Sequence, residues 1–278
     1  MKKEKKENYV MLRDREVVKA NDLIQKSRFS LSLVQQKIIL FVISQINTYD
    51  EDFKEYEFDI KEFCKVVGIE PNNGGNYLNL KRQIQEIRNK SLWIRLPSGR
   101  ETLLAWIEKA SIIYRETEQG EEIPTGKLLI RLDNDMKPYL LRLKENFTRY
   151  ELIYTLRFRS RYSIKLYELV KSIHYHDLEP YEKTYTIEEL KRLLDAEKYD
   201  TYQHFRERVL DTAIEEINKY SDKLVSYQGI REGRKISAIR LKVESKNALE
   251  TIKIRAEIDR EMSFDPNQIS LWDGDYNE

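Results

Sequence analysis

Four basic residues stand close together in the middle of the chain without a neighbouring acid. Arg157, Arg159 and Arg161 alternate, Lys165 follows them, and residues 152–167 contain no Asp or Glu. Basic side chains neutralise the phosphates of a nucleic acid and release its counterions, so this run predicts a contact with a phosphate backbone. The alternative is a solvated face whose ion-pair partners come from elsewhere in the fold, and the sequence leaves that alternative open.

The segment from Thr201 to Lys219 has the pattern of an amphipathic helix. Its apolar residues share one wide face: Phe205, Val209, Leu210, Ala213, Ile214 and Ile217. The opposite face carries polar residues, with basic residues in the first half and acidic residues in the second: His204, Arg208, Asp211, Thr212 and Glu215. A recognition helix that enters a major groove by its N-terminal half has this polarity.

Arg208 is the strongest candidate for reading a base, because a guanidinium can make two hydrogen bonds to a guanine edge. Thr201 and His204 could reach bases or phosphates beside it. Arg206 falls on the apolar side of an ideal helical wheel, so it is a weaker candidate, placed beside a backbone near the helix start. An ordinary amphipathic helix remains the alternative for this segment.

A glycine-flanked basic turn follows this helix. Arg231, Arg234 and Lys235 lie between two strand-like segments, which predicts a hairpin that places its cations on phosphates or in a minor groove. The first half of the chain has a weaker basic signature in the equivalent places: Lys81, Arg82, Arg88, and the turn from Pro97 to Arg100.

These candidate residues belong to an internal repeat, a pattern that occurs twice in the sequence. Residues 36–46 and 58–67 match residues 163–173 and 185–194 in the placement of their apolar positions, at an offset of 127. A third pair, Ile84–Ile87 and Ile214–Ile217, lies at an offset of 130. Each copy predicts a helix, a short strand, two more helices and a hairpin, which is the order of a winged helix. Two such modules favour double-stranded DNA as the partner.

The predicted fold class is α+β, with two tandem winged-helix domains and flexible tails at both ends. We predict a flexible basic tail at 1–16, a first domain at 17–148, the main DNA-reading domain at 149–246, and a C-terminal helix with an acidic tail at 247–278. Hydroxyl side chains mark the predicted helix starts: Ser27 or Ser30, Ser163, and Thr186 with Glu189 at the capping-box spacing.

Composition excludes several other classes of protein. The chain has 49 Lys and Arg against 48 Asp and Glu, so its net charge does not itself indicate nucleic acid. The single Cys64 lies in an apolar helical pattern and excludes both an internal disulfide and a Cys-rich zinc site. No apolar run approaches the ~18 residues that a membrane span needs, and no secretory signal is present. We expect a soluble cytoplasmic protein without a membrane partner.

Enzymatic chemistry has little support in the sequence. His174-Tyr-His176 matches the metal-binding triplet of rolling-circle nickases, and Tyr220 with Lys223 matches their Tyr-x-x-Lys spacing. The triplet follows a helical pattern, whereas a strand is needed to point both imidazoles the same way. There is no phosphate-binding loop and no Ser/His/Asp or Cys/His constellation. We predict no catalytic residue, no metal and no cofactor, with a nickase as the enzymatic alternative.

A short motif stands in the acidic C-terminal tail. Gln268, Leu271 and Trp272 have the layout of peptides that bind bacterial sliding clamps, in which an apolar pair fills a pocket and the Gln is held by hydrogen bonds. Such peptides become ordered on binding. The alternative is that Leu271 and Trp272 pack back onto the second domain.

Taken together, the chain resembles the theta-mode plasmid replication initiators that bind iterons, a family with tandem winged-helix domains. The resemblance covers residues 18–243 and rests on four segments: Ala20–Ile24, Leu31–Lys37, Tyr162–Leu169 and Phe205–Asn218. It implies monomers that bind directly repeated sites and open an origin. It also implies dimers, joined through the first domain, that repress their own gene.

By the same resemblance the second domain reads the major groove, the first touches an adjoining part of the repeat, and the host initiator and replicative helicase are recruited. The clamp-like peptide is not general to that family and stays a separate hypothesis. A winged-helix transcriptional regulator without a role in replication is the alternative function.

Overall fold

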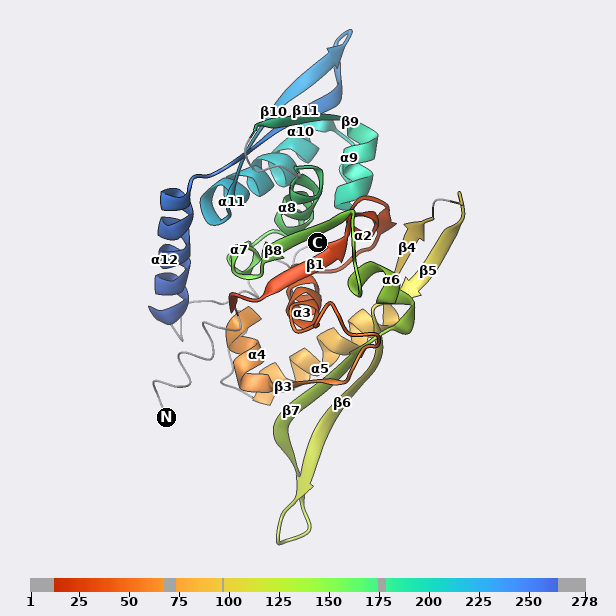
Figure 1. Ribbon diagram of the computed structural model, residues 1–278, viewed down its shortest axis with the longest axis vertical. Coiled ribbons are helices and arrows are strands. Elements are labelled where there is room, and N and C mark those ends of the chain that lie inside the picture. The colour runs from red at the N-terminus through yellow and green to blue at the C-terminus, as the bar shows by residue number, and fades with distance from the viewer. Residues whose placement is uncertain (1–12, 68–73, 97, 175–178, 265–278) are drawn as a thin grey trace.

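The computed structural model describes residues 13–67, 74–96, 98–174 and 179–264, and it contains two winged-helix modules. The modules are stacked along the longest axis of the molecule, with a hairpin at each end (Figure 1). The first helix of each module, α3 (Leu33–Ile43) and α8 (Arg161–Ile173), lies in the middle, between the two hairpins. All eleven residues of α3 are buried. The helix lies in the middle of the core because both modules pack against it, and its buried polar side chains Gln35, Gln36 and Lys37 are hydrogen-bonded.

The second module follows the predicted order of elements. After α8 come β9 (Tyr181–Thr186), α9 (Ile187–Leu194), α10 (Tyr202–Phe205), the π-helical turn η2 (Arg206–Asp211), α11 (Thr212–Tyr220), β10 (Lys223–Glu232) and β11 (Lys235–Ser245). The three strands form an antiparallel sheet in the order β10-β11-β9. The six apolar positions predicted for the third helix are all buried.

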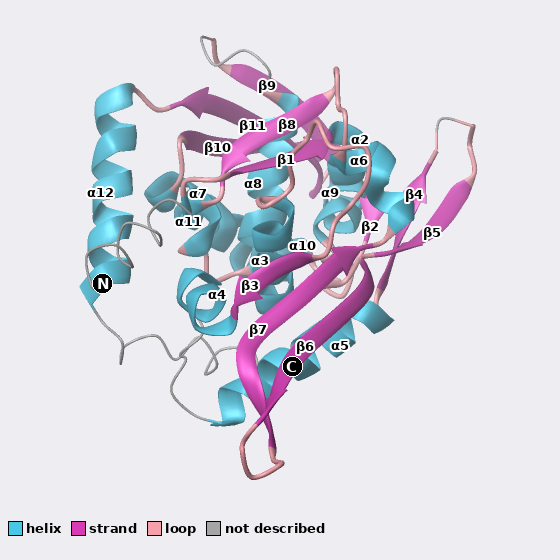
Figure 2. Ribbon diagram, turned by 60° about the horizontal axis from the view of Figure 1, so that its bottom comes forward, coloured by secondary structure: helices cyan, strands magenta, loops and turns pink. Residues whose placement is uncertain are grey.

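The first module has the same topology. Its elements are α3, β3 (Tyr56–Asp59), α4 (Ile60–Val67), α5 (Gly74–Asn89), β6 (Ile107–Glu116) and β7 (Glu122–Leu132). Its sheet has the order β3-β7-β6 (Figure 2). In both modules the strand between the first two helices pairs with the second strand of the hairpin. Helices α4 and α9 are each eight residues long and begin 127 positions apart, so the internal repeat is confirmed.

The predicted wing of the first module, meaning the hairpin that follows its third helix, was misplaced. The turn that includes Arg100 joins β4 (Ser91–Arg95) to β5 (Glu101–Ala105), and these strands form a separate sheet with β2 (Ser27–Arg28). The hairpin equivalent to β10–β11 is β6–β7. The sequence of a hairpin does not reveal which strand it will pair with, and two hairpins follow α5 within a short stretch.

Two predicted helix caps also lie elsewhere. Ser32, rather than Ser27 or Ser30, caps α3 and forms a reciprocal capping box with Gln35. Ser160, rather than Ser163, caps α8 by accepting from the Tyr162 amide at 3.2 Å. The prediction for α9 is confirmed, since Thr186 Oγ1 accepts from the Glu189 amide at 3.0 Å. In each corrected case the sequence offered several hydroxyl residues within one turn, and the backbone geometry selected one of them.

The modules are joined by a two-stranded sheet of β1 (Glu16–Ala20) and β8 (Phe147–Glu151). The predicted boundary at 148/149 therefore falls inside a strand, and residues 13–16 are part of the folded structure. Short elements surround this sheet: α2 (Asn21–Gln25), η1 (Asn134–Met136), α6 (Lys137–Leu140) and α7 (Ile153–Leu156). The predicted C-terminal helix is α12 (Ala248–Phe264). None of the helices within the described ranges is long and apolar enough to cross a membrane.

Candidate nucleic-acid interface

The third helix of the second module presents the predicted polar face to solvent. Thr201 caps it by accepting from the His204 amide at 3.2 Å, and Thr201, His204 and Arg208 are exposed. Within the described part of the chain no ion pair engages Arg208. A free guanidinium in the first half of such a helix can bind a base edge or a phosphate.

The helix is not regular, and this changes the position of Arg206. The π-helical turn at Arg206–Asp211 shifts the register, so Arg206 is half-exposed and does not lie on the buried face. Its guanidinium is 3.3 Å from a carboxylate oxygen of Glu207 and 3.6 Å from one of Asp211. The structure differs from the ideal wheel because that wheel assumes 3.6 residues per turn throughout, and Arg206 remains a candidate for a contact beside the helix start.

The hairpin after this helix carries the predicted cations at its tip. Gly233 has φ 61°, a left-handed conformation that glycine adopts without strain, and it permits the tight turn between β10 and β11. Arg231, Arg234 and Lys235 are exposed, and no ion pair among the described residues neutralises them. This tip is the part of the second module best suited to contact phosphates.

Most of the basic run at 157–165 is enclosed by the fold, unlike the cations of the helix and the hairpin. The Arg157 side chain is only 12% exposed, pairs with Glu261 of α12 and lies 5.8 Å from the ring of Tyr220. Arg161 Nη1 lies 3.0 Å from Asp195 Oδ2. Acids that are remote in the sequence therefore neutralise these two residues, and we remove both from the predicted DNA surface.

Lys165 is also enclosed. Its Nζ donates to the backbone oxygen of Phe29 at 2.9 Å and lies 3.8 Å from the centre of that residue's ring. Burial lowers the pKa of Lys165 to about 8. Arg159 alone keeps an exposed side chain, while its backbone amide donates to Glu216 at 2.9 Å. Of the four predicted residues in this run, only Arg159 can reach a nucleic acid in this conformation.

The first module offers fewer free cations. Lys81 is exposed on α5, and Arg82 beside it bonds to Asn79 at 3.1 Å and approaches Glu86 at 3.9 Å. Arg100 is exposed on the β4–β5 turn. The tip of the β6–β7 hairpin is acidic and carries Glu116, Glu118, Glu121 and Glu122. This wing would repel phosphates, unlike the wing of the second module.

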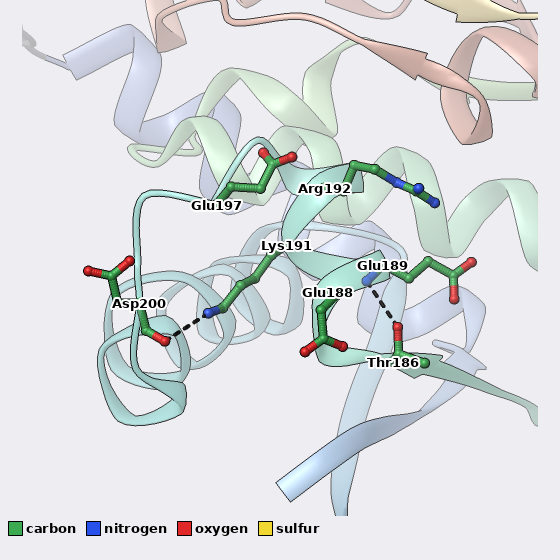
Figure 3. Close-up of a pocket in the computed structure, with 7 residues that line it drawn as sticks. All are labelled: Thr186, Glu188, Glu189, Lys191, Arg192, Glu197 and Asp200. Atoms are coloured by element: carbon green, nitrogen blue, oxygen red, sulfur yellow. Dashed lines mark hydrogen bonds between the residues drawn. The ribbon is translucent and has the colours of Figure 1, made fainter.

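An open cleft lies between α9 and the loop before α10 (Figure 3). Four carboxylates line it against two cations: Glu188, Glu189, Glu197 and Asp200 against Lys191 and Arg192. This balance disfavours an anionic ligand. Lys191 Nζ lies 3.4 Å from the Asp200 backbone oxygen and also binds that of Tyr199. The lysine thus holds the loop that leads into the third helix.

Two of the candidate residues for a nickase, His174 and Tyr220, are engaged or buried in the fold. His174 Nε2 lies 2.8 Å from the backbone oxygen of Glu179, and its Nδ1 lies 3.2 Å from Lys223 Nζ. Tyr220 is only 8% exposed. His176 lies outside the described residues, as do Gln268, Leu271 and Trp272 of the tail motif. Among the described residues no cluster of three His, Cys, Asp or Glu side chains could hold a metal ion.

Sequence reasoning missed the residues that attach the third helix to its wing. Asn218 Oδ1 accepts from the Val225 amide at 2.7 Å, and its Nδ2 donates to the Val225 carbonyl at 2.9 Å. The Tyr227 hydroxyl donates to Asp211 Oδ1 at 2.6 Å. Nothing in the local sequence marks these residues, because their partners are chosen by packing.

Comparisons with known proteins agree with this arrangement. Residues 16–171 match the family model "Initiator Replication protein, WH1", and residues 186–243 match "Initiator Rep protein, WH2". A "Replication initiation protein" of Escherichia coli is 26% identical over 216 residues, which are 75% of this chain and 64% of that protein. A "PI protein" of Escherichia coli is 33% identical over 135 residues, 41% of this chain and 43% of that protein. The matches thus span less than two thirds of either relative.

A solved structure has the same fold. The crystal structure of Pi initiator protein in complex with iteron DNA matches with a TM-score of 0.67 at 21% identity, over 84% of this chain and 99% of that one. The two family models confirm, at the level of the family, the resemblance inferred from the four sequence segments. Because the first family model alone covers more than half of its length, this chain belongs to the family of initiator replication proteins built from WH1 and WH2 modules.

Proposed function

We propose that this protein initiates plasmid replication by binding repeated origin sites in double-stranded DNA. The observation that carries the proposal is the surface of the second module, where exposed cations on a recognition helix and on its wing lie free of acidic partners: Arg208, Arg231, Arg234 and Lys235. A structural neighbour with the same two modules was crystallised on iteron DNA. The proposed contacts are a major groove for the helix and phosphates or a minor groove for the wing.

The first module has a supporting role in this proposal. Lys81, Arg82 and Arg100 are its candidate DNA contacts, and its acidic wing would repel phosphates. We propose that copies of the chain also pair through this module, and that the dimer represses its own gene. Binding of the host initiator and the replicative helicase would follow origin opening. The tail peptide with Gln268, Leu271 and Trp272 would bind the sliding clamp.

The proposed activity requires no covalent chemistry. Binding can deform a duplex and promote local unpairing, because the larger protein–DNA interface on a bent duplex offsets the free-energy cost of bending. We therefore assign no catalytic residue and no cofactor. A transcriptional regulator would bind the same kind of site without opening it, and this difference separates the two functions.

The test uses the full-length chain and the DNA that flanks its gene. Fluorescence anisotropy should show preferential binding to tandem repeats of about two helical turns each over a scrambled duplex. Permanganate probing on a supercoiled plasmid should then reveal unpaired thymines beside the repeats. Binding without new reactive thymines would favour the regulator, and equal affinity for the scrambled duplex would overturn both functions.

A further inference from the structure

The third helix of the second module (α10, η2 and α11), called the reading helix from here on, contacts the wing at three points along one strand. Tyr202 lies against Gly229, Asp211 binds Tyr227, and Asn218 binds Val225. The three strand positions are spaced two residues apart on β10, so side chains at these positions face the same side of the sheet. Asn218 binds the backbone of Val225 rather than its side chain. A Cβ on Gly229 would lie 3.5 Å from the Tyr202 hydroxyl, so the start of the helix is in van der Waals contact with this strand.

The π-helical turn makes this alignment possible. In a regular helix, Tyr202 and Asp211 would lie on opposite sides, since nine residues correspond to a rotation of about 180° beyond two full turns. The turn at Arg206–Asp211 takes up one additional residue between them. Thr212 Oγ1 donates to the Glu207 carbonyl at 3.2 Å, five residues earlier, and satisfies an acceptor inside the irregular segment.

Asp211 is the centre of the resulting cluster. One of its carboxylate oxygens accepts from the Tyr227 hydroxyl at 2.6 Å, and the other lies 3.6 Å from Arg206 Nε. Arg206 and Asp211 are five positions apart, a spacing that a π turn brings together. The carboxylate therefore links the first half of the reading helix to the strand that leads into the wing tip.

We propose that Asp211 and Tyr227 are positioning residues that lock the wing to the reading helix, so that Arg208 and the wing cations meet the duplex at one set spacing. This inference rests on the proposed function, because it assigns the lock to that DNA surface. An unlocked wing could still touch phosphates of any duplex. It would no longer do so in register with the bases that the helix reads, and selectivity for the repeated site would fall.

The experiment compares the full-length chain with Tyr227→Phe, which removes the hydroxyl but keeps the ring. Affinities for the repeated duplex and for a scrambled duplex are measured by anisotropy, together with the thermal midpoint. The expected result is about a tenfold smaller ratio of the two affinities, with the midpoint little changed. Tyr181→Phe is the matched control, since Tyr181 is an exposed tyrosine of β9 in the same sheet.

A double substitution separates positioning from a merely structural effect. In the unchanged chain, Arg234→Ala should weaken binding to the repeated duplex. When Tyr227→Phe has already removed the bond to Asp211, Arg234→Ala should weaken binding to the repeated duplex much less, because the wing is no longer held at its set spacing from the reading helix. Asp211→Asn keeps an acceptor for Tyr227 and should retain more selectivity than Asp211→Ala.

The outcomes distinguish the inference from the function on which it rests. An unaltered affinity ratio in Tyr227→Phe, with fully additive effects of Tyr227→Phe and Arg234→Ala, would overturn the positioning role. An unchanged chain that shows no preference for the repeated duplex would instead overturn the proposed function.

Discussion

Lys19 Nζ lies 2.6 Å from Glu168 Oε1, and this buried ion pair joins the first strand of the chain to the first helix of the second module. The two side chains are 4% and 5% exposed. The Tyr150 hydroxyl also donates to Glu168, and burial beside that carboxylate raises the pKa of Tyr150. The contact between the modules is therefore partly electrostatic, and removing one partner would leave an uncompensated buried charge.

Lys19→Met should lower the free energy of unfolding by about 3–5 kcal/mol, because Glu168 then stays buried without its cation. Urea unfolding at pH 7 measures this loss. Combining Lys19→Met with Glu168→Gln should recover part of it. Lys26→Met is the control, since Lys26 forms an exposed pair with Asp22 at 2.8 Å and should cost less than about 1 kcal/mol. Equal losses from both lysine variants would contradict the buried pair's importance.

Lys37 should make stability depend on pH. Its Nζ donates to the Leu156 carbonyl at 2.8 Å, and burial lowers its pKa to about 7. The unfolded chain holds this proton up to a pH of about 10.4. Between these values the unfolded state binds more protons, so stability rises with pH, and it falls as the pH drops toward 7.

The measurement for Lys37 is urea unfolding at pH 7 and pH 9. The unchanged chain should gain about 2 kcal/mol over this interval relative to Lys37→Met, which lacks the titrating amine. Lys165 is present in both proteins, so its own titration cancels in the difference. Parallel stability profiles for the two proteins would show that Lys37 does not titrate in this range.

Arg208→Ala should weaken binding to the repeated duplex by about 1–3 kcal/mol if its guanidinium reads a base. Binding to a scrambled duplex should change much less, and the thermal midpoint should stay the same because the side chain is exposed. Anisotropy titrations provide both affinities. Arg142→Ala removes an exposed arginine of the first module that pairs with Glu51 and is the matched control. An unchanged affinity would remove Arg208 from the site.

The wing cations should contribute to binding on repeated and scrambled duplexes. Replacing Arg234 and Lys235 by Ala should lower affinity for repeated and scrambled DNA, because phosphate contacts carry no sequence information. The slope of log affinity against log salt should decrease in magnitude by about 2 when two phosphate contacts are removed. The same two measurements on Arg157→Ala should show an unchanged slope, since Glu261 already neutralises Arg157.

The tail motif is tested independently of DNA. Replacing Leu271 and Trp272 by Ala in the full-length chain should abolish binding to a bacterial sliding clamp, because the apolar pair would fill the clamp pocket. Affinity for the repeated duplex should remain the same. Surface plasmon resonance with immobilised clamp measures the first quantity, and comparable clamp affinities for both proteins would rule out this peptide.

The sequence by itself determined the order of elements in each module. Apolar periodicity is a local signal, so the three helices of each copy were predictable, and the offset of 127 between Ile60 and Ile187 survives as two helices of equal length. The exposed cations at 208, 231, 234 and 235 were also predictable, because a helical face and a hairpin tip are defined by neighbouring residues.

Only the tertiary structure decided which cations remain available. The acids that neutralise Arg157 and Arg161 come from positions 261 and 195. Lys165 is enclosed against Phe29, and the first wing belongs to β6–β7 because of its pairing with β3. Each of these contacts joins residues far apart in the chain, and no local pattern encodes a partner that folding alone brings near.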